Sequence, residues 1–194
     1  MEYTRRSTLG ALGSGLTLTL AGCLSAPGSG STITETETVP LAVRSTRPAW
    51  HDEGVVGHAV LIGSDEDQAV ALEAFDLPGE RVDAIESSLE GLDHQTERLL
   101  LVESVGPSAC YRTVEFENVR LIDGTLRATA RVVKSGDKEA CATVITYPSA
   151  LLRVTVDGTP PTDAEITIHD GWGDQETDSV SAGDGIDGLV PESS

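Results

Sequence analysis

The apolar positions of this chain mostly recur at every second residue, which is the period of a β-strand. Short β-branched segments at 39–43 and 55–62 end at turn-forming residues, and a strongly apolar segment follows at 98–105. The region from 110 to 168 is expected to form continuous antiparallel sheet. The pattern therefore predicts a mainly β fold with an antiparallel β-sandwich-like domain.

One segment has the period of an α-helix instead. A single helix is predicted over about 79–92, where Val82, Ile85, Leu89 and Leu92 recur at intervals of three and four residues on one face. Such spacing gives a helix an apolar side that can pack on a sheet.

The best-defined strand pair is a hairpin around Asp123-Gly124, because a two-residue Asp-Gly loop favours the type I′ turn. Farther from the loop the apolar phase slips, and Val114 and Phe116 face the core only if one extra residue intervenes near Glu117-Asn118. We therefore predict a β-bulge there. The predicted pairs are Leu121 with Leu126, Val119 with Ala128, Phe116 with Ala130 and Val114 with Val132.

The two ends of the chain lack this patterning. Residues 25–38 are rich in Ser, Thr, Gly, Pro and Glu, which is typical of a flexible spacer, and 170–194 reads as a disordered acidic tail. The predicted organisation is a signal peptide at 1–22, a lipidated cysteine with its spacer at 23–38, a single β-rich domain at 39–169, and the tail at 170–194.

The N-terminal segment has the composition of an export signal. Arg5 and Arg6 precede an apolar segment, Leu9–Leu20, whose length suits a signal peptide better than the ~20 residues that cross a bilayer. The paired arginines resemble the twin-arginine export signal. Thr8 occupies a position where an aromatic residue is usual, so the general secretory route also stays open.

The tetrapeptide Leu20-Ala21-Gly22-Cys23 follows this segment and resembles the lipobox of bacterial and archaeal lipoproteins. The resemblance implies that Cys23 becomes the lipidated first residue of the mature chain. The lipid membrane would then be a partner through Cys23, and the chain would face the extracytoplasmic side. The alternative is an ordinary thiol near a cleavage site.

The chain is strongly acidic, with a formal net charge of −19, and its lysines are Lys134 and Lys138 alone. Nucleic acid is therefore not expected as a partner, because binding a polyanion requires basic patches. The acid excess and scarcity of lysine resemble proteins of halophilic archaea, in which molar salt reduces the Debye length to about 3 Å. The hydrophobic content of 39% argues against a wholly disordered chain.

Two further cysteines form an even pair once Cys23 is assigned to lipid. The hairpin register places Cys110 at the open end of the hairpin near Gly136, and Cys141 is expected to begin the next strand at that end. We predict a Cys110–Cys141 disulfide, which suits an exported protein. A metal or redox site is the alternative, although the sequence has no Cys-x-x-Cys and no histidine within ten residues of either cysteine.

No catalytic residue, metal site or cofactor is predicted. The densest polar and aromatic cluster is Trp50–Glu53, and His51 beside carboxylates is more typical of a loop salt bridge than of a ligand. Met1 is the sole methionine, which disfavours a blue-copper site. A serine hydrolase requires a histidine beside its nucleophile, and Ser108 lies in a turn without an adjacent histidine. Paired carboxylates for glycoside cleavage stay open because acids are abundant.

The segment from about 99 to 154 resembles the PrcB-like C-terminal domain. The similar parts are the Gly106–Tyr111 turn, the Asp123–Leu126 hairpin and the Thr146–Pro148 segment that precedes a strand. The chain differs at Ala109-Cys110, where the family usually has paired glycines before the tyrosine.

The family occurs in lipoproteins and includes an accessory subunit that stabilises a surface protease complex. The resemblance therefore implies a membrane-anchored extracytoplasmic lipoprotein that acts as a non-catalytic binding or accessory module with an envelope protein partner. The alternatives are a small envelope hydrolase and a purely structural envelope protein.

Overall fold

The computed structural model describes residues 30–186, with gaps at 75–82, 84, 87–88 and 137–139. The predicted export signal with Arg5 and Arg6, the predicted lipidation site Cys23 and the last eight residues lie outside the described part.

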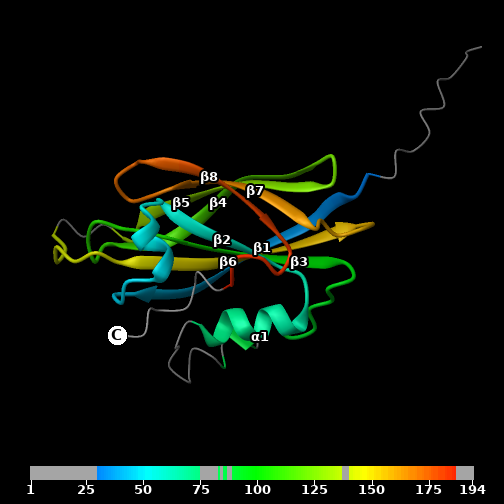
Figure 1. Cartoon of the computed structure of the whole chain (residues 1–194), viewed down its shortest axis with the longest axis horizontal. Helices are drawn as coiled ribbons and strands as arrows, with labels where there is room; N and C mark the ends of the chain where they lie inside the picture. Colours follow the sequence, from blue (N-terminus) through cyan, green and yellow to red (C-terminus); the bar gives the residue numbers. More distant parts are fainter. Residues whose placement is uncertain (1–29, 75–82, 84, 87–88, 137–139, 187–194) are drawn as a thin grey trace, which may run out of the picture.

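Two four-stranded sheets pack face to face, so the β-sandwich-like fold is confirmed (Figure 1). In spatial order, the first sheet contains β1 (Thr32–Arg44), β6 (Tyr147–Asp157), β3 (Glu97–Ser104) and β2 (Gly57–Ile62), all antiparallel. The second contains β4 (Tyr111–Ile122), β5 (Thr125–Lys134), β7 (Asp163–His169) and β8 (Gln175–Ser181).

The expectation of one continuous antiparallel sheet from 110 to 168 was wrong. β6 lies in the first sheet, and β5 and β7 of the second sheet run parallel. Parallel neighbours require the chain to return to its starting end between them. Here β6 makes that return within the opposite sheet.

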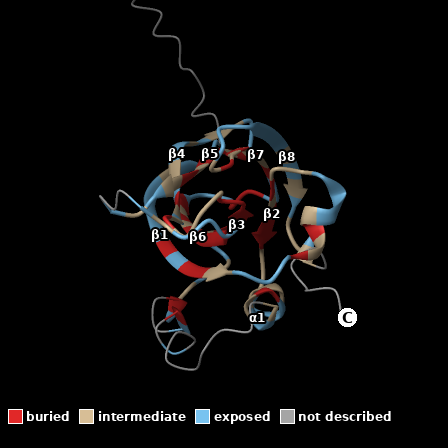
Figure 2. Cartoon of the chain, turned by 90° about the vertical axis from the view of Figure 1, so that its left-hand side faces the viewer, coloured by how far each residue is buried: buried red, intermediate tan, exposed pale blue. Residues whose placement is uncertain are grey.

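The first sheet is buried on both faces, which explains the uninterrupted apolar segment of β3. Leu100 and Val102 face the core between the sheets, and Leu99 and Leu101 face a second apolar cluster on the outer side. Helix α1 (Asp65–Glu73) covers that outer side (Figures 1 and 2). The second sheet instead has one apolar face, and β5 alternates between buried and partly exposed residues.

The sequence pattern did not predict α1, whose composition is mostly acidic and polar. Ser64 caps the helix by accepting a hydrogen bond from the Asp67 amide at 3.1 Å, and three acidic residues occupy its first turn. Within the predicted helix 79–92, the described residues Ile85 and Leu89 are helical and buried in the outer cluster. Leu92 packs against the same cluster but lies beyond the helical residues, and Val82 lies outside the described residues.

The hairpin between β4 and β5 has the predicted turn and the predicted bulge. Asp123 and Gly124 both have positive φ, as a type I′ turn requires. The register shifts between Glu117 and Arg120, with Asn118 in the left-handed region at φ 54°. Three of the four predicted pairs form: Leu121 with Leu126, Phe116 with Ala130, and Val114 with Val132. The fourth does not, because Val119 falls within the shift and is not paired with Ala128.

The bulge provides a test of backbone conformation. Asn118→Val should lower the free energy of unfolding by about 1–2 kcal/mol, because a β-branched residue tolerates the left-handed region poorly. Asn118→Gly is the matched control and should not destabilise the chain. Urea unfolding of both variants measures the difference, and equal stabilities would contradict the assigned conformation.

Both ends of the domain extend beyond the predicted limits. β1 begins at Thr32 rather than near residue 39, and β8 occupies part of the segment predicted to be a disordered tail from 170. The first half of β1 and most of β8 are exposed polar residues, so neither shows apolar alternation. Backbone pairing with β6 and with β7 orders these strands.

The chain enters the sandwich at one end and places a group of loops at the other. At the entry end, Thr32 pairs with Asp157, close in the topology to the Asp123-Gly124 turn. We define the distal end as the opposite end, formed by the described residues 44–56, 104–111, 134–136, 140–147 and 169–175. It lies on the left in Figure 1, away from the start of β1.

Candidate functional site

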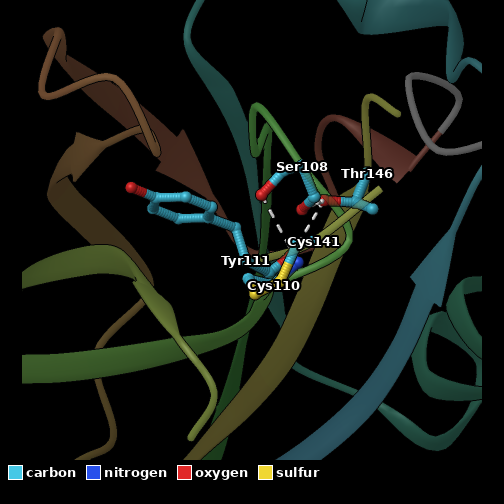
Figure 3. The surroundings of a disulfide bond; sticks show 5 residues. All are labelled: Ser108, Cys110, Tyr111, Cys141 and Thr146. Atoms are coloured by element: carbon cyan, nitrogen blue, oxygen red, sulfur yellow. Dashed lines mark hydrogen bonds between the residues drawn. A yellow bond between two sulfur atoms is a disulfide. The ribbon is translucent and has the colours of Figure 1, made fainter. Parts of the chain in front are cut away.

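The turn that connects β3 to β4 organises the distal end. Gly106 and Thr146 exchange two backbone hydrogen bonds of 2.8 and 3.0 Å. The Thr146 hydroxyl also donates to the Tyr111 carbonyl at 2.8 Å and lies 3.3 Å from the Ser108 carbonyl (Figure 3). One buried threonine therefore fixes the whole turn to the start of β6.

The predicted Cys110–Cys141 disulfide is present in this turn, with the two Cα atoms 5.7 Å apart (Figure 3). Cys110 is buried. Cys141 does not begin a strand, as the sequence suggested, but lies in the loop before β6. The Ala109 amide donates to the Ala142 carbonyl at 3.0 Å, so the loop is held both covalently and by a hydrogen bond.

This disulfide-bonded loop exposes two adjacent apolar side chains. Val144 and Ile145 are each 44% exposed, whereas the following Thr146 is buried. The loop therefore presents an apolar tip while its base is attached to the turn at residues 106–111.

A second loop, at residues 170–174 between β7 and β8, presents an exposed aromatic ring. The buried Asp170 accepts hydrogen bonds at one carboxylate oxygen from the amides of Trp172, Gly173 and Asp174, at 2.8–2.9 Å. Trp172 at its tip is 56% exposed. The sequence analysis did not identify this tryptophan, because the surrounding Asp- and Gly-rich residues were assigned to the tail.

The 170–174 loop is also fixed to the turn at residues 106–111. The Gly171 amide donates to the Val105 carbonyl at 2.9 Å. A Cβ atom at Gly171 would lie 2.4 Å from Pro107 Cδ and 2.9 Å from Tyr111 Cδ1, so this close approach requires glycine. Both exposed apolar loops therefore rest on the same turn.

A buried ion pair lies beneath the distal end. Glu103 of β3 is fully buried, and its carboxylate accepts hydrogen bonds from the Arg44 guanidinium and, at 2.8 Å, from Trp50 Nε1. Burial raises the pKa of Glu103, while Arg44 and Trp50 oppose that rise. The one available sequence signal was the presence of an acid, Glu103, within the apolar segment 98–105.

The Trp50–Glu53 cluster of the sequence forms the short 3-10 helix η1 (Ala49–Glu53). A salt bridge does form in this cluster, but it joins Asp52 to Arg47, both exposed, and does not involve His51 as expected. His51 instead contacts the rings of Trp50 and Tyr147 edge-on, with a centroid distance of 5.3 Å to Tyr147. Burial and the nearby Arg47 lower the pKa of His51.

A cavity of about 350 Å³ lies where the edge strands β2 and β8 meet, and it contains a histidine and several acids. Asp178 accepts a hydrogen bond from the Ala59 amide at 3.1 Å, and Glu176 accepts one from the Val56 amide at 3.3 Å. His58 Nε2 lies 2.6 Å from the Gly185 carbonyl oxygen. These groups satisfy backbone positions along the edge of β2 and close the sandwich on this side.

The remaining candidate groups are dispersed. The histidines come from η1, β2, the segment before β3 and the end of β7. In the described ranges, no three His, Cys, Asp or Glu side chains are grouped to hold a metal ion, and no histidine accepts a hydrogen bond from a hydroxyl or thiol. No helix in the part of the chain that the structure covers is long and apolar enough to cross a membrane.

Comparison of the chain with protein-family models, curated proteins and solved structures gave no match.

Proposed function

We propose that this chain is an exported lipoprotein, anchored through a lipid on Cys23 to the extracytoplasmic face of the cell membrane, and that it acts as a non-catalytic binding or accessory module. The most specific form of this proposal is that the chain stabilises a surface protease or another envelope complex. The observation that supports it best is the opposite placement of the chain entry and the exposed apolar loops.

The distance from the proposed anchor to the domain is short. Thr32, where β1 begins, follows Cys23 by nine residues, which span at most about 30 Å when fully extended. A lipid on Cys23 would keep the entry end near the bilayer. The distal end, with its exposed Val144, Ile145 and Trp172, would then be able to face a partner beyond the membrane surface.

The charge of the chain narrows the choice of partner. A net charge of −19 disfavours nucleic acid and other polyanions. The resemblance of residues 99–154 to the PrcB-like C-terminal domain favours a protein complex of the envelope.

A small envelope hydrolase is the second candidate, because the β2–β8 cavity contains His58 beside Glu176 and Asp178. The backbone contacts of both acids favour a structural role instead. A purely structural envelope protein is the third candidate, and it would require no exposed apolar loops.

Cys23→Ser should release the protein from membranes, because the substituted residue cannot carry the thioether-linked lipid. Fractionation into membrane and soluble fractions at molar salt measures the effect, and Ser25→Ala serves as the neighbouring control that should remain membrane-bound. Retention of Cys23→Ser on the membrane would contradict the anchor.

The binding role has its own test. Affinity purification of the full chain from detergent-solubilised membranes at molar salt should recover a stoichiometric envelope protein. Recovery of the chain alone, at all detergent and salt conditions that leave it folded, would contradict an accessory function.

A further inference from the structure

Exposed apolar side chains are concentrated at the distal end. Of the four large apolar side chains that are exposed in the described part of the chain, Val144, Ile145 and Trp172 lie on distal loops, and Val70 lies on α1. Exposed apolar groups that gather on one face are typical of interaction sites, whereas single ones are ordinary surface.

The side chains in this group are held by rigid supports. Asp170 binds three successive amides of the loop that presents Trp172, and the disulfide fixes the loop that presents Val144 and Ile145. Little conformational entropy would be lost on docking, because the loops are already ordered. Tryptophan is also among the residues that contribute most to binding energy at protein interfaces.

Two exposed cations adjoin this apolar group, together with one exposed acid, Asp174, in the loop of Trp172 itself. Lys134 is exposed at the end of β5, and its Nζ lies 5.7 Å from the centroid of the Tyr111 ring, against which Gly171 packs. Arg112 is exposed beside Tyr111.

We propose that the distal end docks a second protein of the envelope, which inserts Trp172 into an apolar pocket bordered by carboxylates that face Lys134 and Arg112. This inference rests on the proposed function, since it names the surface and the chemistry of the partner. Charge complementarity favours that partner over a second copy of this chain, whose net charge of −19 would oppose association. The position of the proposed anchor at the other end of the domain favours a protein over a membrane as the partner.

The test uses the full-length chain in its own membranes at molar salt. Photo-crosslinkable p-benzoylphenylalanine replaces Trp172 in one variant and Val70, the exposed apolar residue outside the distal end, in the control. Crosslinking at 172 should give one discrete protein adduct that is absent at 70. Mass spectrometry identifies the partner, which is then purified for affinity measurements.

The affinities of variants for that purified partner test whether Trp172 and Lys134 contribute to binding as proposed. Trp172→Ala should weaken binding about 30-fold, the size of effect expected of an anchoring residue, and Trp172→Phe should weaken it less. Lys134→Glu should weaken binding most at low salt, because salt screens its interaction with carboxylates. Val70→Ala should bind as the unaltered chain does. Circular dichroism checks that each variant is folded.

Several results would overturn the inference. They are equal adducts at 172 and 70, adducts to lipid rather than protein, adducts to this chain itself, or an affinity unchanged by Trp172→Ala. A partner that co-purifies equally with the unaltered chain and with Trp172→Ala would contradict docking at the distal end but would leave the proposed accessory function intact. Absence of any protein partner, by crosslinking and by affinity purification, would remove both.

Discussion

Arg44→Met should lower the free energy of unfolding by about 3–5 kcal/mol at neutral pH, the size of effect expected when one partner of a buried ion pair is removed. Glu103 is fully buried and Arg44 is 10% exposed at its side chain. The methionine would leave the carboxylate buried without its guanidinium partner. Chemical unfolding monitored by tryptophan fluorescence measures the change, because Trp50 donates to the same carboxylate.

The pH dependence and a double variant distinguish a lost charge interaction from lost packing. Burial raises the pKa of Glu103, so the folded variant binds a proton more readily than the unfolded chain, and its stability should recover as the pH falls towards about 4. Arg44→Met combined with Glu103→Gln should also recover much of the loss, since the amide oxygen can still accept from Trp50.

An exposed pair provides the control for this prediction. Arg127 and Glu165 lie 3.3 Å apart on the second sheet, and both side chains are about two-fifths exposed. Arg127→Met should cost about 0–1 kcal/mol, because water already solvates both charges. Losses of equal size for Arg44→Met and Arg127→Met would contradict a stabilising buried pair.

Local signals predicted a large part of this fold. The Asp123-Gly124 turn sets the register of β4 and β5 by its own backbone preference, and a phase slip in the apolar pattern identified the bulge at Asn118. The same register predicted that Cys110 lies close to Cys141, and the disulfide between them confirms it. These features depend mainly on residues that are close in the sequence, where turn chemistry and strand period act directly.

The features that were missed depend on contacts between distant segments. β8 and the first half of β1 are solvent-facing strands whose polar side chains leave no apolar alternation, so pairing with β7 and β6 orders them. The parallel pairing of β5 with β7 exists only because β6 crosses to the other sheet. Arg44 and Glu103 are 59 residues apart. Nothing in either local segment specifies the other.

Of the candidate site, the sequence predicted only the Cys110–Cys141 disulfide. The cysteine pair follows from the hairpin register, whereas Trp172 lies in an Asp- and Gly-rich segment that resembles disordered sequence. The fold changes the meaning of that segment, because Asp170 is buried and binds the amides of its own loop. The Asp and Gly residues here form an ordered turn, and composition alone does not distinguish such a turn from a disordered tail.

Cys110→Ala combined with Cys141→Ala should lower the free energy of unfolding by about 3–4 kcal/mol, because the unfolded chain regains the entropy of a closed loop spanning 31 residues. The distal fold should persist in the variant. The Ala109–Ala142 hydrogen bond and the paired backbone bonds between Gly106 and Thr146 hold the same loop without the bridge. Urea unfolding under oxidising conditions, with hydrogen exchange at these amides, measures both effects.

Single variants and reductant test whether the covalent bond itself produces the effect. Cys110→Ala and Cys141→Ala should each destabilise the chain about as much as the double variant, since either one breaks the bridge and the two losses do not add. Reductant should lower the stability of the unaltered chain to that of the double variant and leave the double variant unchanged. Additive losses would indicate that packing of the buried Cys110 dominates, and an unaltered chain insensitive to complete reduction of its thiols would show that the bridge contributes nothing to stability.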